Sequence, residues 1–138
     1  MKKLWIVLLV TLFMVVSVGF AAVVYTNQIT IGWDAVTKLA DGTNVPTGDV
    51  ISYQVYTKKG TAAEVLVGEI NSLQQTITFT VEGEYLVGVR TKRAITGGAI
   101  VYSTITWSNS TDIAAVPVPF SVGYYIPPAV PKGLKPIP

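Results

Sequence analysis

The sequence predicts an all-β protein, built either as an antiparallel sandwich or as a small barrel. After residue 25, apolar and polar residues alternate with a period of two in one run after another, as half-buried strands require. Turn residues such as Asp41-Gly42 and Gly97-Gly98 separate these runs, and no helical periodicity appears there. Short strands at this spacing are typical of sandwiches and barrels whose sheets bury one face.

Six runs are expected to be strands. The first is ITIGWDAV, in which Ile29, Ile31 and Trp33 share one face, and the others are ISYQVYTKK, EVLVGEI, TITFTV, EYLVGVRTK and AIVYSTITW. Because side chains alternate across a strand, each run presents one apolar face to a core. The residues that we expect to form this core are Trp33, Tyr53, Val55, Phe79, Tyr85, Val87 and Val89.

The charge distribution argues against a nucleic-acid partner. Only 13% of the 138 residues are charged, and two of the ten Lys and Arg are Lys2 and Lys3, so the other eight balance the eight Asp and Glu. Nucleic-acid binding needs a basic patch or stripe. The one dense group is Arg90, Lys92 and Arg93, which predicts either a solvated sheet face or a patch for an acidic partner. The chain has no Cys and no His, which removes disulfides, thiol chemistry, histidine bases and the usual zinc sites.

The N-terminal segment predicts export. MKKLWIVLLVTLFMVVSVGFAAVV has two lysines, a long uncharged run and small residues at Gly19 and Ala21, which is typical of a signal peptide over residues 1–21. The alternative is an uncleaved anchor helix, because Leu4 to Tyr25 is long enough to span a bilayer. Both predict a secreted or surface-held domain, with the lysines left inside. The compact Lys-Lys start is typical of bacteria.

Four elements in order resemble a fibronectin type III domain over about residues 28–109. They are a Trp at the second strand (ITIGWDAV), a third strand with Tyr-x-Val (ISYQVYTKK), the stretch GEYLVGVRTKR, and YSTITWSN where the last strand belongs. The resemblance implies an antiparallel two-sheet sandwich, here over residues 22–112, in which the Tyr85 hydroxyl bonds to backbone upstream. The missing Cys pair disfavours a disulfide-bonded immunoglobulin domain.

One feature departs from this pattern. Only residues 22–27 separate the expected cleavage site from the Trp-containing strand. The first strand is therefore short, made from the remainder of the signal segment, or supplied from elsewhere. An open sheet edge would follow, and open edges invite pairing.

The C-terminal segment, residues 113–138, is expected to be an extended tail. Seven of the eight prolines lie from Pro117 onward, and proline favours extended chain without backbone donors. PAVPKGL resembles the lead-in to a first fibronectin type III strand, so the tail is part of a tandem array, folds back on its own open edge, or adds a strand to a neighbouring subunit. The tail residues expected to make contacts are Phe120, Tyr124, Tyr125, Ile126 and Leu134.

Two groups of acidic and polar residues are candidate sites, and each also has a simpler structural interpretation. Asp41, Asn44 and Asp49 in DGTNVPTGD offer oxygen ligands for calcium, but the same residues favour turns. Glu82 and Glu84 flank a glycine, and paired carboxylates can hydrolyse glycosides. A solvated turn with no cleft is the plainer interpretation of that pair.

Two further groups concern surface recognition. Trp33 and Trp107 are candidates for a sugar-binding platform, although Trp33 continues a core-facing pattern. Asn109-Ser110-Thr111 fits the glycosylation acceptor pattern, which a bacterium would leave unused. Some fibronectin type III domains bind integrins through an RGD sequence in the loop before the last strand, and no RGD occurs in this chain.

These observations predict a non-enzymatic, extracytoplasmic binding or structural module without a cofactor, which mediates protein–protein or surface interactions or self-association. One alternative is a filament or assembly subunit whose aromatic, proline-rich tail packs on, or adds a strand to, a neighbour. Another is an accessory carbohydrate-binding domain of a secreted enzyme.

Overall fold

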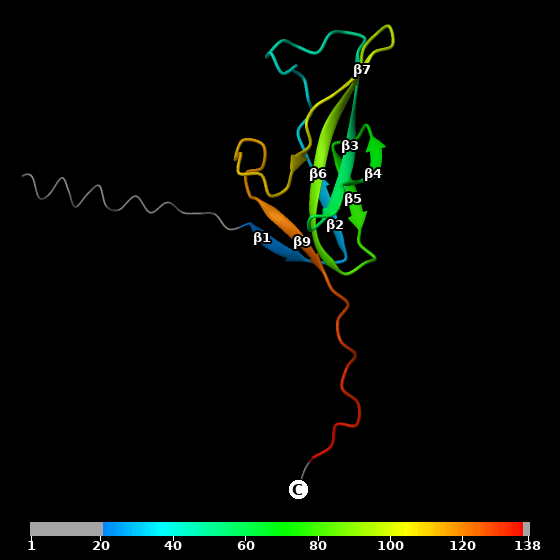
Figure 1. The fold of residues 1–138 in the computed structure, drawn as a ribbon, viewed down its shortest axis with the longest axis vertical. Helices are drawn as coiled ribbons and strands as arrows, with labels where there is room; N and C mark the ends of the chain where they lie inside the picture. The colour runs from blue at the N-terminus through cyan, green and yellow to red at the C-terminus, as the bar shows by residue number, and fades with distance from the viewer. Residues whose placement is uncertain (1–20, 137–138) are drawn as a thin grey trace, which may run out of the picture.

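The computed structural model describes residues 21–136, and this range contains nine strands in two sheets (Figure 1). The prediction of an all-β, two-sheet fold is confirmed. The expected signal or anchor segment lies almost wholly outside the described residues. Between residues 21 and 136, no helix is long and apolar enough to cross a membrane. The strands are β1 Ala22–Tyr25, β2 Gln28–Gly32, β3 Val50–Lys59, β4 Val65–Ile70, β5 Gln74–Thr78, β6 Gly83–Ala94, β7 Ile100–Tyr102, β8 Thr106–Trp107 and β9 Phe120–Tyr124.

The large sheet is built around two long central strands. Its order is β1-β9-β6-β3-β4, with β7 and β8 also pairing along β6. β3 and β6 run antiparallel over ten paired positions, from Val50↔Ala94 to Lys59↔Tyr85. Both strands are rich in β-branched and aromatic residues, which pack well on a pleated surface.

The small sheet consists of β2 and β5, paired antiparallel from Gln28↔Thr78 to Gly32↔Gln74. The core between the sheets contains Val55, Ile77, Phe79, Val87 and Val122. Of the residues expected in the core, Tyr53, Val55, Phe79 and Val87 are buried. Trp33, Tyr85 and Val89 are half-buried and pack against the same cluster.

The last strand of the sandwich is divided into pieces. A single run, AIVYSTITW, was expected, but β7, β8 and β9 pair successively along β6. The chain leaves the sheet at Ser108, whose N–H donates to Val87 O at 2.8 Å, and returns at Phe120, whose N–H donates to Ser108 O at 2.8 Å. Residues 109–119 therefore form a loop inserted into one strand position.

The first part of the proline-rich segment 113–138 contributes a strand, β9. β9 pairs antiparallel with β6 at Gly83–Tyr85 and parallel with β1, with Ala22 opposite Phe120. The sheet thus includes residues 120–124, which the sequence placed in the extended tail. β9 lies between Pro119 and Pro127 and contains no proline, so it keeps its backbone donors. Residues 125–136 contain no strand and extend away from the body (Figure 1).

Candidate functional site

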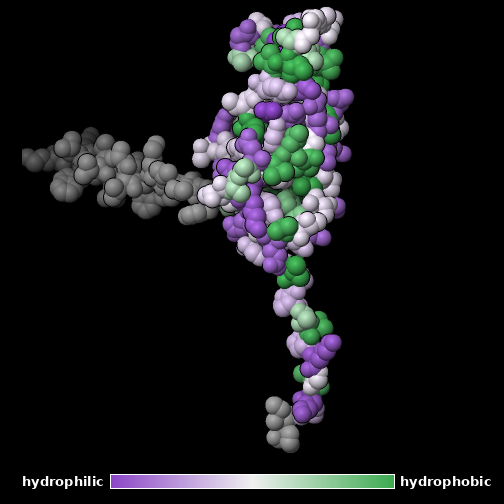
Figure 2. All heavy atoms as spheres, turned by 45° about the vertical axis from the view of Figure 1, so that its right-hand side comes forward, coloured by the Kyte–Doolittle hydropathy of each residue, from purple (hydrophilic) through white to green (hydrophobic). Residues whose placement is uncertain are grey.

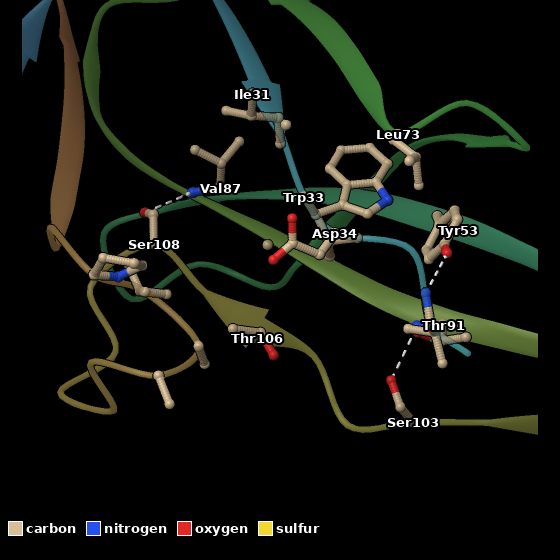
Figure 3. A pocket seen from close by; sticks show the side chains of 18 of the residues that line it. Ile31, Trp33, Asp34, Tyr53, Leu73, Val87, Thr91, Ser103, Thr106 and Ser108 are labelled. Atoms are coloured by element: carbon tan, nitrogen blue, oxygen red, sulfur yellow. Dashed lines mark hydrogen bonds between the residues drawn. The ribbon is translucent and has the colours of Figure 1, made fainter. Parts of the chain in front are cut away.

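A groove of about 710 Å³ opens between the two sheets (Figure 3). It exists because the small sheet is shorter than the large one. β2 ends at Gly32, whereas β3 and β6 continue, so the inner face of β6 at Val89 and Thr91 has no strand of the small sheet opposite it. The segment after β2 and residues 114–118 of the inserted loop form the remaining walls.

Trp33 forms an aromatic wall of this groove. Its ring lies 5.5 Å from the ring of Tyr53, tilted by 57°. The Tyr53 hydroxyl accepts a hydrogen bond of 2.9 Å from the Val36 N–H, which holds the segment after Trp33 against β3. The indole Nε1–H of Trp33 is buried and has no hydrogen-bond partner within residues 21–136. An unpaired buried donor costs about 1–3 kcal/mol.

Asp34 is the only charged side chain among the described residues that line the groove. Figure 3 shows its carboxylate on the side of the groove that Thr106 and Ser108 form. Two of the hydroxyls are already used, since Ser108 Oγ accepts from Val87 N–H at 3.3 Å and Ser103 Oγ from Thr91 N–H at 2.9 Å. The groove therefore combines apolar walls with one available carboxylate, a chemistry suited to an extended apolar segment that carries a positive charge.

On the outer face of the large sheet, away from the groove, Arg90 is surrounded by aromatic and hydrogen-bonding side chains. The Arg90 guanidinium lies between two rings, 5.2 Å from the centre of Tyr56 and 4.2 Å from that of Tyr102. Its Nε donates to Gln54 Oε1 at 2.8 Å, and the Tyr56 hydroxyl donates to the same oxygen at 2.8 Å. Cation–π stacking and these bonds hold Arg90 in place.

The other two basic residues of this group are also paired within the domain. Lys92 Nζ lies 2.7 Å from Glu69 Oε1, and Gln54 donates to the second oxygen of Glu69. The Lys92 and Gln54 hydrogen bonds lower the pKa of Glu69, and the Glu69 bond raises the pKa of Lys92.

Arg93 points to the other side of β6, since side chains alternate across a strand. It pairs with Asp49 at 2.6 Å. The three basic residues are therefore each engaged by a residue from another part of the domain, and they do not gather into one free cationic cluster.

The three candidate calcium ligands, Asp41, Asn44 and Asp49, lie in turn and loop contacts. Asp41 Oδ1 accepts from the hydroxyl and the N–H of Thr43, and these bonds lower the pKa of Asp41. Asp49 accepts from Thr96 N–H and from Arg93, which lower its pKa. Asn44 forms an isolated β-bridge with Lys38. Within the described range, no group of three or more acidic side chains is placed to hold a metal ion.

The two glutamates that flank Gly83 have separate surroundings. Glu82 accepts a hydrogen bond from Ile126 N–H, so it fixes the start of the projecting tail. Glu84 lies within β6, opposite Gly123 of β9. Neither residue lines the groove between the sheets.

Trp33 and Trp107 lie on opposite faces of the large sheet. Trp33 packs on the inner face, whereas the ring of Trp107 covers Gly88 so closely that a Cβ there would lie 2.7 Å from it. Lys58 Nζ lies 5.3 Å from the centre of the Trp107 ring. The two tryptophans therefore do not form a shared platform. Gly88 in the middle of a strand was the sequence signal for this close approach.

The tail residues divide into two groups. Phe120 and Tyr124 pack against the core of their own domain, and the ring of Tyr125 lies 6.5 Å from that of Tyr25. Ile126 and Leu134 are exposed. The most buried residue of the segment, Val122, was missing from the expected core.

The chain matches no model of a known protein family, no curated protein and no solved structure. The groove, the outer face and the tail are therefore the observations from which a function is inferred.

Proposed function

We propose that this protein is a non-enzymatic binding or structural module that acts outside the cytoplasm through protein–protein contacts. The observation that carries the proposal is the tail after β9. It leaves a packed sandwich and exposes Ile126 by 64%, Val130 by 78% and Leu134 by 99%. Figure 2 shows the tail standing clear of the body, with hydrophobic residues between hydrophilic ones. Proline-rich segments with apolar side chains are a common form of docking peptide.

Four carboxylates of the domain support a structural role. Asp49 and Glu69 form ion pairs, Asp41 closes a turn with Thr43, and Glu82 binds backbone at the start of the tail. These groups stabilise loops and strand pairs, and they do not converge on the groove.

We further propose a fibronectin type III-like sandwich as the fold family. The Tyr85 hydroxyl donates to Val81 O four residues upstream, which is the contact that the resemblance implies. Trp33 follows β2 and packs against the core. The basic and apolar N-terminal sequence supports an extracytoplasmic location.

An assembly subunit is the second candidate, and exposed sheet edges favour it. The large sheet ends in β1 on one side and in β4 on the other. Both strands expose apolar side chains, among them Val24 and Val65. Exposed apolar edges are templates for pairing with another chain.

Photo-cross-linking of the exported full chain tests the proposal. A photoreactive phenylalanine analogue replaces Leu134 in the tail, and a matched variant carries it at Thr47, which is exposed in a loop. We expect a protein adduct from position 134 and none from position 47. The mass of the adduct identifies the partner as a second copy or another protein. Absence of adducts at both positions, or equal labelling at both, would contradict the proposal.

A further inference from the structure

We propose that residues 127–132 of one copy bind, as a polyproline II helix, in the groove between the sheets of a second copy. The helix ends before Gly133, whose φ of 71° lies outside the polyproline II region. This inference rests on the proposed function and specifies its partner and its site. It differs from strand addition, because the contact lies between the sheets and not along an edge.

The tail is better suited to a groove than to a sheet ladder. Pro127, Pro128 and Pro131 lack the N–H groups that a ladder needs. A polyproline II helix needs no internal hydrogen bonds and repeats every three residues, so Pro128 and Pro131 lie on one edge of it. Val130 supplies an exposed apolar side chain beside that edge.

The groove has the lining that such a helix requires. Proline-rich peptides dock in grooves lined by aromatic side chains, and Trp33 and Tyr53 lie in this one. Its volume of about 710 Å³ suits a few residues of extended chain.

The charges of the two surfaces are complementary. Lys132 follows Pro131 directly in the tail. Asp34 is the only charged side chain among the described groove residues, and it forms no ion pair within the described part of the chain. A basic residue next to the docked prolines would therefore meet the carboxylate of the groove.

The direction of the tail favours a second copy over the same chain. The tail begins after Tyr124 at the end of β9, whereas the groove is walled by Phe120 at the start of β9 and by residues 114–118. In Figure 1 the tail points away from the body. A contact between the tail of one copy and the groove of the next leaves one free tail and one free groove, so the assembly can grow.

Sedimentation velocity of the full chain over a range of concentrations is the first test. We expect the full chain to associate reversibly. Val130→Asp should raise the dissociation constant by about tenfold or more, because it places a carboxylate where the valine would be buried in the complex. Val130 is exposed in the tail, so the substitution leaves the fold intact. The matched control is Val65→Asp on the β4 edge, which is also exposed and should leave the association unchanged.

A labelled synthetic peptide of residues 126–138 is the second test, read by fluorescence anisotropy. Full-length Val130→Asp protein is the receptor, because its own tail no longer competes. We expect binding that weakens with added salt, and about fivefold weaker binding when Asp34→Lys is added. A peptide with Lys132→Glu should restore affinity for the Asp34→Lys receptor, which a misfolded receptor could not do.

The outcomes separate the alternatives. A wild-type chain that stays monomeric while the peptide binds Val130→Asp more tightly than wild type would show that each tail fills its own groove, which overturns the second-copy proposal. Association lost with Val65→Asp but not with Val130→Asp would point to edge pairing and overturn it too. No peptide binding would overturn the groove site, whereas a Leu134 cross-link to another protein would leave the proposed function standing.

Discussion

At the scale of single residues, the burial of Val122 shows that the folded domain extends through β9. Its side chain is fully buried although it lies in a proline-rich stretch. We expect Val122→Ala to lower the free energy of unfolding by about 2 kcal/mol, through lost apolar burial and a cavity. Urea denaturation followed by tryptophan fluorescence measures this change. Val118→Ala, at an exposed position in the preceding loop, should stay within about 0.5 kcal/mol of wild type. Equal effects at both positions would contradict the packing of β9.

The Tyr85 hydroxyl is a second residue with a defined contribution. It donates to the carbonyl of Val81, and the ring packs 4.6 Å from that of Phe79. Tyr85→Phe keeps the ring and removes the bond, so we expect a loss of about 1 kcal/mol in the free energy of unfolding. Tyr125→Phe serves as the control, because the described hydrogen bonds include none from its hydroxyl. A loss no larger than that of the control would show that the bond does not stabilise the fold.

The Asp49 carboxylate links two loops in a way that depends on pH. Thr96 N–H and then Arg93 lower its pKa in the folded protein. A carboxylate whose pKa is lower when folded stabilises the protein above its unfolded pKa of about 3.9, and this contribution is lost as pH falls through the folded value. The melting temperature of Asp49→Asn should therefore be lower than that of wild type at pH 7, and this difference in melting temperature should shrink below about pH 4. A difference independent of pH would contradict this role.

At the scale of elements, the inserted loop of residues 109–119 is separable from the strand that it interrupts. Its ends are already joined by the hydrogen bond from Phe120 N–H to Ser108 O. Replacing residues 109–119 by Gly-Gly should change the free energy of unfolding by only about 1 kcal/mol, because loop-closure entropy varies slowly with length. The same change removes Ala114–Val118 from the groove wall, so binding of the tail peptide should fall. Thermal melts and anisotropy measure the two effects, and an unfolded variant would show that the loop supports the sandwich.

Alternation along the strands was enough to predict most elements. β2, β3 and β6 each carry an apolar face that is visible in the sequence, and the core residues Val55 and Val87 followed from it. Ile77 of β5 is also buried in the core, but it was absent from the expected core. β9 was missed because its proline-rich surroundings dominate the local composition. Its parallel pairing with β1 joins strands almost a whole domain apart in the chain, which no local pattern specifies.

The candidate sites were less predictable for the same reason. Arg90, Lys92 and Arg93 are close in the sequence, but their partners come from other parts of the chain. The groove arises from the difference in length between two sheets, and alternation within one strand carries no information about it. Sequence patterns therefore indicated which side chains face inward, and the pairing of distant strands determined what they meet.

At the scale of the whole molecule, removal of the projecting tail should leave the stability of the domain nearly unchanged but abolish its assembly. A chain ending at Tyr125 loses the bond from Ile126 N–H to Glu82 and the exposed residues beyond it. We expect its free energy of unfolding to stay within about 1 kcal/mol of wild type, since one exposed hydrogen bond contributes little. A chain ending at Ile113 also lacks β9 and the fully buried Val122, so it should show no cooperative unfolding.

Circular dichroism melts combined with sedimentation velocity test both chains. The chain ending at Tyr125 should melt cooperatively and remain monomeric at concentrations where the full chain associates. Cooperative melting of the chain that ends at Ile113 would show that β9 is dispensable, and the sandwich would then end before the inserted loop. Association that persists after removal of residues 126–138 would instead assign assembly to the exposed edges of β1 or β4, where backbone groups and apolar side chains are open to pairing.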